Sequence, residues 1–230
     1  MNSTSVSAII AVFNGEAFIQ DALASVRNQT VPPFEVIVVD DGSTDRTAEL
    51  VQNEPGVTLI RQSNAGPSAA RNAAIARARG EWLAFLDADD LWLPHKLERQ
   101  LALANAQPEF EIVLGNYLPF LEPGTSCPKW QNPQQLVDGA ETFVPSVVLA
   151  RRTLFSRVGL FNESLRISED FEWLVRARLA GVTMGRLPEI VTRKRLHQAN
   201  LSHQLSQAQR GMAQTLMQIV RQRRSAASNP

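Results

Sequence analysis

The sequence has little cysteine and no excess of either charge. Cys127 is the single thiol among 230 residues, which excludes an internal disulfide and a zinc site built from several thiolates. The 23 Lys and Arg residues balance 23 Asp and Glu residues, so the formal net charge is zero. Without a basic excess we expect no nucleic-acid partner. The scarcity of cysteine suits a reducing compartment, so we expect a cytoplasmic protein.

Long hydrophobic runs are also missing. Residues 1–5 are polar and uncharged, and the apolar run over residues 6–13 is too short for a secretion signal. No stretch approaches the roughly 20 apolar residues that a membrane-spanning helix needs. We therefore expect a soluble chain.

Two glycine-rich phosphate-binding motifs are absent as well. A dinucleotide fold places Gly-x-Gly-x-x-Gly after its first strand, where this chain has Phe-Asn-Gly-Glu at residues 13–16. The loop Gly-x-x-x-x-Gly-Lys followed by Ser or Thr does not occur either. Any bound nucleotide must therefore be held by side chains and a metal ion.

The first half of the chain alternates apolar runs with helical patterns. Such an alternation is typical of an α/β fold with a mostly parallel, doubly wound sheet flanked by helices. Ligands of these sheets bind at the carboxyl ends of the strands. With 44% hydrophobic residues, the chain can fill one large core. The predicted strands cover residues 6–12, 34–39, 57–60 and 82–86, and the predicted helices cover 16–28, 44–51, 69–78 and 94–106.

The second half is less regular. Residues 117–133 carry four prolines and a glycine, which predicts a long loop. Around it we expect strands at residues 110–115, 143–149 and 182–191, a short helix at 151–158, and a longer helix that opens at 168–170.

Three carboxylates follow the fourth predicted strand. Asp87, Asp89 and Asp90 repel one another, and a divalent cation relieves that repulsion. An Asp-x-Asp pair with few other ligands suits Mg²⁺ or Mn²⁺ that also binds nucleotide phosphates. The alternative is a solvated turn in which Asp89 or Asp90 caps the next helix. Other polar residues, among them Asn14, Asp41 and Asn64, also follow strands, so we expect them at the same edge of the sheet.

Five segments together resemble the inverting family-two glycosyltransferases of the GT-A fold. The resemblance implies a nucleotide-sugar-binding half to about residue 106, an acceptor half over residues 107–203, and a single domain over residues 1–203. The matching order runs over residues 6–202. The segments are residues 6–14, 38–45, 64–72, 85–90 and 169–173.

The resemblance implies a donor site on the first half, with a UDP-sugar preferred by family habit. Ala11 and Phe13 would border the base, Asp41 would accept a base N–H, and Arg71 would support the nucleotide or its phosphates. From the residues alone, Asp41 can instead form an Asp-Gly-Ser turn, and Arg71 can be a solvated helical arginine. The other residues placed in this nucleotide-sugar site are Asn14, Glu16, Asn64, Gly66, Asp87 and Ala88; Asn64 and Gly66 can also simply form a turn.

The resemblance also implies metal and catalytic residues. Asp89 would bind Mn²⁺ or Mg²⁺ directly, and Asp87 would reach the ribose or the waters of the metal. Asp170 would be the general base of a single displacement, supported by Glu169 and by Trp173 as a floor for the sugar. Carboxylates in a first helical turn are also common in structural proteins, and Trp173 can be a core residue. Arg195 and His197 would contact the diphosphate or metal, although a surface histidine is an equal alternative for His197.

The implied activity is transfer of one sugar to a hydroxyl of a glycan or lipid-linked acceptor. Processive members add Gln-x-x-Arg-Trp and membrane helices, which this chain lacks, so we expect one sugar per encounter. One rival is a non-catalytic sugar-nucleotide-binding or partner subunit that retains the fold. A sugar nucleotidyltransferase is the other, but it would need a glycine-rich, lysine-bearing loop after the first strand.

The last predicted element is a C-terminal amphipathic helix and tail over residues 204–230. Its apolar side and basic end suit packing on the domain, a homodimer contact, or a peripheral contact with an anionic membrane on the cytosolic face.

Overall fold

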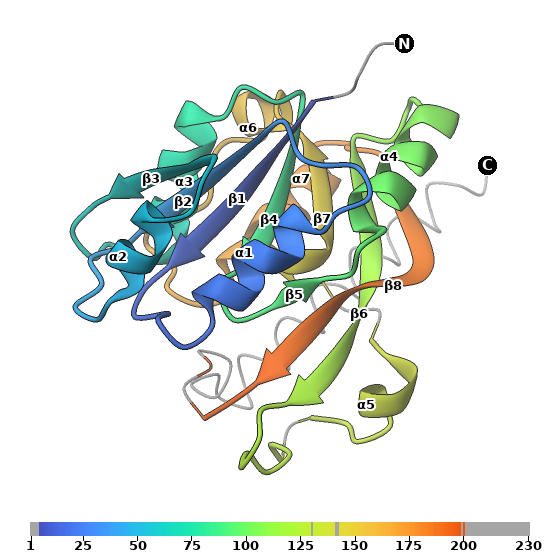
Figure 1. Ribbon diagram of the computed structural model, residues 1–230. Helices are drawn as coiled ribbons and strands as arrows, with labels where there is room; N and C mark the ends of the chain where they lie inside the picture. The colour runs from blue at the N-terminus through green and yellow to red at the C-terminus, as the bar shows by residue number, and fades with distance from the viewer. Residues whose placement is uncertain (1–4, 130, 141–142, 199, 201–230) are drawn as a thin grey trace.

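The computed structural model describes residues 5–129, 131–140, 143–198 and 200. Their strands form an eight-stranded sheet in the order β3-β2-β1-β4-β7-β6-β8-β5. Helices cover both faces of this sheet (Figure 1). The predicted C-terminal helix lies outside the described residues. Within the described part, no helix is long and apolar enough to cross a membrane.

The first half folds as the alternation predicts. Strands β1, β2, β3 and β4 pair in parallel, and each is followed along the chain by a helix. This confirms the α/β class and the mostly parallel, doubly wound sheet. The elements are β1 Val6–Val12, α1 Ile19–Arg27, β2 Glu35–Asp40, α2 Thr47–Gln52, β3 Val57–Arg61, α3 Pro67–Arg77, β4 Trp82–Asp87 and α4 Lys96–Ala106.

The second half completes the sheet with mixed pairing. Strand β7 is antiparallel to both β4 and β6, whereas β8 is parallel to β6. Past the body of the sheet, β6 and β8 continue as a two-stranded arm beside α5 (Figure 1). The elements are β5 Leu91–Trp92, β6 Ile112–Leu121, α5 Gln135–Asp138, the 3₁₀ helix η1 Pro145–Val147, β7 Val148–Arg151, α6 Leu154–Arg157, α7 Glu169–Leu179 and β8 Met184–Leu196.

Two predictions for this half are wrong in part. Residues 117–121 belong to β6 rather than to a loop, and Pro119 is tolerated because β7 stops pairing with β6 beyond Leu114 and leaves that edge open. The strand predicted at 143–149 begins only at Val148, since Pro145 starts a 3₁₀ turn. The two-residue strand β5 is too short to leave a pattern in the sequence.

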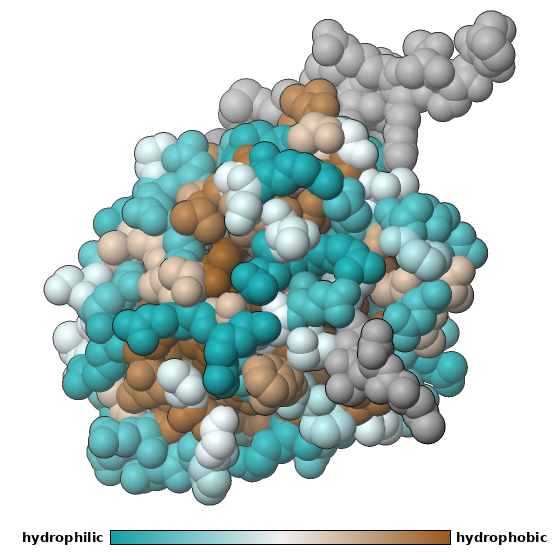
Figure 2. Space-filling view, turned by 90° about the horizontal axis from the view of Figure 1, so that it is seen from above, coloured by the Kyte–Doolittle hydropathy of each residue, from teal (hydrophilic) through white to brown (hydrophobic). Residues whose placement is uncertain are grey.

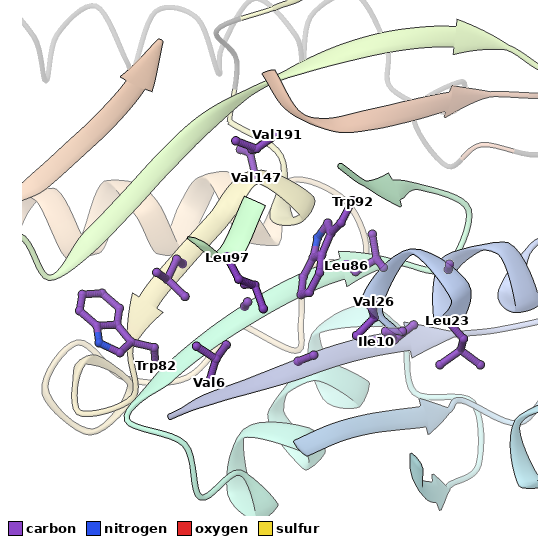
Figure 3. Close-up of a cluster of buried hydrophobic side chains, with 14 of the residues drawn as sticks. Val6, Ile10, Leu23, Val26, Trp82, Leu86, Trp92, Leu97, Val147 and Val191 are labelled. Atoms are coloured by element: carbon purple, nitrogen blue, oxygen red, sulfur yellow. The ribbon is translucent and has the colours of Figure 1, made fainter. Parts of the chain in front are cut away.

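The sheet separates two hydrophobic clusters. Helices α1, α2 and α4 pack on one face, where Ile10, Leu23 and Trp92 are buried (Figure 3). Helices α3, α6 and α7 pack on the other face, where the rings of Phe155 and Trp173 stack at 4.6 Å. Each such fully buried side chain contributes about 1.5–3 kcal/mol to folding. Both clusters hold the strand ends, and therefore the loops that follow them, in fixed positions.

The outer surface is mixed in character. In the view of Figure 2, hydrophilic residues cover much of the face, and hydrophobic ones show between them in separate areas. This distribution is typical of a protein surface in contact with water.

Candidate active site

The loops after β1 and β2 are linked by hydrogen bonds of two side chains for which the family resemblance implies a place in the nucleotide-sugar site. Asn14 Oδ1 accepts from the amide of Thr44 at 2.9 Å, and Glu16 Oε2 accepts from the amide of Arg46 at 3.0 Å. Asn14 adopts a left-handed backbone with φ of 49°. These two residues therefore shape the edge of the sheet, and their contact with a ligand stays a prediction.

Asp41 is buried and organises the next loop. Its Oδ1 accepts from Gln62 Nε2 at 2.7 Å and from the amide of Ala65 at 2.9 Å, and its Oδ2 accepts from the amide of Gly66 at 2.7 Å. Asp41 therefore holds the segment that leads into α3 rather than an Asp-Gly-Ser turn, where the amide of Ser43 donates to Asp40 Oδ1 at 2.9 Å. The turn roles of Asn64 and Gly66 stay predictions. Since a carboxylate offers about four acceptor positions, Oδ2 retains capacity for one more donor, and the base contact stays a prediction.

Phe13 extends from the end of β1 into solvent. The residue is 51% exposed, and such high exposure is unusual for a large aromatic residue. Ala11 precedes it in β1 and is paired with Asp87 of β4, which places a small side chain beside the acidic loop. Ala88, in that loop, packs partly against the core. An exposed ring next to small residues is suited to stacking on a flat ligand.

Arg71 is buried in α3 and joins the two halves of the site. Its Nη2 donates to Asp87 Oδ1 at 2.8 Å, and its Nη1 donates to Glu169 Oε1 at 2.5 Å. These two carboxylates outweigh the effect of burial and raise the pKa of Arg71, so the guanidinium stays charged. The alternative of a solvated helical arginine is wrong, because the residue is only 6% exposed.

Asp170 lies half-buried in the first turn of α7, next to Glu169. Its Oδ1 accepts from the amide of Phe171 at 2.7 Å. Burial and the nearby charge of Glu169 raise the pKa of Asp170 to about 7, although Arg71 acts in the opposite direction. A general base works best with a pKa near the working pH. The geometry therefore gives Asp170 the proton affinity that its predicted role requires.

Trp173 is a core residue. Its ring stacks on Phe155, and its Nε1 donates to the carbonyl of Gly159 at 2.8 Å. Only 1% of the residue is exposed, so the core alternative holds and the ring is not available as a floor for the sugar. Trp173 instead anchors α7, and with it Asp170, on the sheet.

Asp89 and Asp90 have different environments. Asp90 is fully buried and accepts from Ser146 Oγ at 2.7 Å and from the amide of Arg195 at 3.0 Å. Asp89 is partly exposed, and its Oδ2 lies 2.9 Å from both His197 Nε2 and Asn200 Nδ2. Neither caps the next helix, since α4 begins after His95 without a side-chain cap. The capping part of the turn alternative is therefore wrong. The segment itself does form a turn, because the amide of Asp90 donates to the carbonyl of Asp87 at 3.0 Å, and Asp90 is structural.

The surroundings of Asp89 keep it ionised. Burial alone would raise its pKa, but the hydrogen bond with His197 and the charge of Lys194 lower it overall. Among the described residues, no donor from another residue reaches Oδ1 of Asp89, and no three acidic, histidine or cysteine side chains converge into a complete metal cage. A Mg²⁺ or Mn²⁺ ion that shares phosphate oxygens needs only one or two carboxylates from the protein. The residues present therefore fit such an ion.

The segment after β8 contacts the side chain of Asp89 through His197 and Asn200. His197 is partly buried beside the ring of Phe18, so the surface alternative is wrong. The nitrogens of the Arg195 guanidinium each contact a protein acceptor, and its diphosphate contact stays a prediction. Asn200 was missed by sequence reasoning, because an isolated Asn carries no signal of its contact with Asp89 across 111 positions.

Comparison with known proteins places the chain in a family. Residues 7–154 match the model described as glycosyl transferase family 2. An uncharacterized glycosyltransferase of Rickettsia typhi is 28% identical over 217 residues, which cover 86% of this chain and 66% of that protein. The uncharacterized glycosyltransferase EpsJ of Bacillus subtilis is 34% identical over 184 residues, which cover 72% and 53%.

Solved structures agree with this placement. Residues 1–349 of TarS from S. aureus, in complex with UDP, superpose with a TM-score of 0.66 and 25% identity over 84% of this chain and 60% of that one. The complex of the same protein with UDP-GlcNAc gives a TM-score of 0.71 at 24% identity, over 88% and 61%, and supports the fold. The chain spans no more than about two thirds of the length of these relatives. On the extent of the family match, the chain belongs to glycosyl transferase family 2.

Proposed function

We propose that this chain transfers one sugar from a nucleotide-sugar donor, with UDP as the preferred nucleotide, to a hydroxyl of a glycan or lipid-linked acceptor. The observation that carries the proposal is the double contact of Arg71 with Asp87 and Glu169. It brings the acidic loop after β4 next to the first turn of α7. An inverting displacement needs the departing diphosphate and a base on opposite sides of one carbon. The acidic loop would hold the diphosphate, and Asp170 would be the base.

In the proposed reaction, Asp170 removes the proton of the acceptor hydroxyl as its oxygen attacks the anomeric carbon. The bond from that carbon to the diphosphate oxygen breaks in the same step, and the nucleoside diphosphate leaves. With a pKa raised to about 7, roughly half of the Asp170 side chains are ionised at neutral pH. The family membership and the UDP complex of TarS support the choice of donor.

The remaining residues bind and orient the donor. Asp89, assisted by Asp87, would hold Mn²⁺ or Mg²⁺, and such an ion neutralises the diphosphate as it departs. His197 and Asn200 keep the Asp89 carboxylate in one orientation. The exposed ring of Phe13 would stack on the base.

The test compares turnover and binding in wild type and Asp170→Asn. UDP release from UDP-GlcNAc in the presence of Mn²⁺ is measured beside UDP affinity by calorimetry. Loss of a general base lowers turnover by about 10²–10⁴-fold, whereas UDP affinity should stay within about twofold because Asp170 does not bind the nucleotide. Glu172→Gln, two residues further along the same helix, is the matched control and should behave as wild type.

Other outcomes point elsewhere. Unchanged turnover in Asp170→Asn would place the base at another residue. UDP binding without turnover of any nucleotide sugar, in wild type, would support the non-catalytic subunit instead. Once a product is obtained, its anomeric configuration by NMR checks inversion.

A further inference from the structure

Arg195, one residue before the end of strand β8, lies between two aromatic rings. Its guanidinium carbon lies 4.8 Å from the centre of the Phe18 ring and 4.9 Å from the centre of the Phe120 ring. Phe18 immediately precedes α1 and Phe120 belongs to β6, so the side chain sits between two elements that are distant in sequence. Only 6% of the residue is exposed.

The N–H groups of the same guanidinium form hydrogen bonds with three segments of the chain. Nε donates to the carbonyl oxygen of Asp89 at 3.0 Å, Nη2 donates to Asp21 at 3.0 Å, and Nη1 donates to Glu122. Asp21 lies in α1, and Glu122 follows β6. Because the five N–H groups of arginine have a fixed planar geometry, these contacts constrain the position of the Asp89 backbone.

The backbone of this region adds to the constraint. The amide of Arg195 donates to Asp90 Oδ1 at 3.0 Å, and its carbonyl accepts from Asn200 Nδ2 at 3.2 Å. Asn200 in turn contacts Asp89 Oδ2. Thus the side chain of Arg195 holds the main chain of Asp89, and Asn200, which holds the Asp89 side chain, is bound to the main chain of Arg195.

We propose that Arg195 is a positioning residue for Asp89, so that it sets the metal-binding loop by acting on the protein rather than on the donor. This inference rests on the proposed function, because it assumes that Asp89 binds the divalent ion. Lysine cannot replace it, since an ammonium group has no planar fork to reach Asp21, Glu122 and the Asp89 carbonyl together.

Arg193 supplies a matched control. It is two residues earlier on β8, and its guanidinium carbon also lies over the Phe120 ring, at 4.3 Å. Its main chain pairs with Leu91 of β5, but within the described residues its side chain makes no hydrogen bond to residues 88–90. Arg193→Gln therefore removes the same charge and the same type of ring contact without touching the loop.

The experiment compares wild type, Arg195→Gln, Arg195→Lys and Arg193→Gln in the full chain by three measurements. They are amide hydrogen exchange of residues 88–91 without metal, Mn²⁺ affinity with UDP present by electron paramagnetic resonance, and UDP affinity without metal. Substitution of a residue that orients a metal ligand typically lowers metal affinity by about 10–100-fold. Both Arg195 variants should bind Mn²⁺ at least about tenfold more weakly and exchange faster, with metal-free UDP affinity within about twofold. Arg193→Gln should match wild type.

Two results would overturn the inference. The first is Mn²⁺ affinity and exchange in Arg195→Gln that equal those of wild type. The second is a loss of metal-free UDP affinity without faster exchange, which would identify a direct diphosphate contact. If wild type binds neither Mn²⁺ nor UDP, the proposed function fails, while the exchange comparison still tests the positioning role.

A milder variant covers the case in which Arg195→Gln does not fold. Asp21→Ala removes one anchor of the guanidinium, and the Asp21 side chain is 61% exposed, so the fold should tolerate the change. Faster exchange at residues 88–91 and weaker Mn²⁺ binding are expected in the same direction. Wild-type values in both measurements would contradict the proposal.

Discussion

Arg71 and Glu169 are separated by 98 residues in the sequence and form a buried ion pair with 2.5 Å between Nη1 and Oε1. The first residue belongs to helix α3 in the half with the parallel strands, and the second opens helix α7, which carries Asp170. The same guanidinium contacts Asp87. One side chain therefore sets the relation between the acidic loop and the predicted base.

Removal of Arg71 should destabilise the protein strongly. Arg71→Gln leaves the buried carboxylate of Glu169 and the partly buried one of Asp87 without their counter-charge, and breaking a buried pair in this way costs about 3–5 kcal/mol. The measurement is urea unfolding followed by tryptophan fluorescence. Arg77→Gln, on the exposed side of the same helix, is the control and should change the free energy of unfolding by no more than about 0.5 kcal/mol. A small effect at Arg71 would mean that the two acids are neutralised in another way.

Compared with wild type, the Asp170→Asn variant should become progressively more stable as the pH rises. The folded-state pKa of Asp170 is about 7, above the ordinary value of 3.8, so in wild type the protonated form favours folding and that advantage is lost between about pH 4 and pH 7. Asn does not ionise. The difference in Tm between variant and wild type should therefore increase by several degrees from pH 4 to pH 8, measured without metal or nucleotide.

The control for that experiment is Asp138→Asn, at an exposed position of α5. Its Tm should follow wild type at every pH. A difference between Asp170→Asn and wild type that does not change with pH would show that Asp170 has no raised pKa in the folded protein.

Turnover should depend on the ionisation of Asp170. Because only the carboxylate accepts a proton, kcat/KM for UDP-GlcNAc should fall tenfold per pH unit on the acid side of about pH 7. UDP affinity is measured over the same range to separate binding from chemistry. A rate that is flat down to pH 5, at constant affinity, would argue against Asp170 as the base.

Asp89→Asn should abolish the effect of metal on nucleotide binding. In wild type, chelation of Mn²⁺ should weaken UDP binding by about tenfold or more, since Asp89 would hold the ion and the ion would neutralise the diphosphate. In the variant, UDP affinity should be low and unchanged by the chelator. Calorimetric titrations with and without chelator make the comparison. A variant that still responds to Mn²⁺ like wild type would move the metal site away from Asp89.

The sequence was most informative about local features. The strands from Val6 to Asp87 are continuous apolar runs, and the helices between them have hydrophobic residues at helical spacing, so both follow from periodicity alone. The carboxylates after β4 are adjacent in the chain, and their mutual repulsion requires no knowledge of the fold. Pro119 in β6 and the two-residue β5 were missed because pairing with β8, rather than local preference, makes them strands.

By itself, the sequence determined the α/β class, the parallel direction of the first strands and the acidic loop after β4, because these depend on patterns within short segments. The tertiary structure decided which side chains serve one another. Only there do Arg71 meet Glu169, Trp173 enter the core and Arg195 lie against the Asp89 loop. Such contacts join residues tens to more than a hundred positions apart, and packing of whole helices and strands sets their geometry.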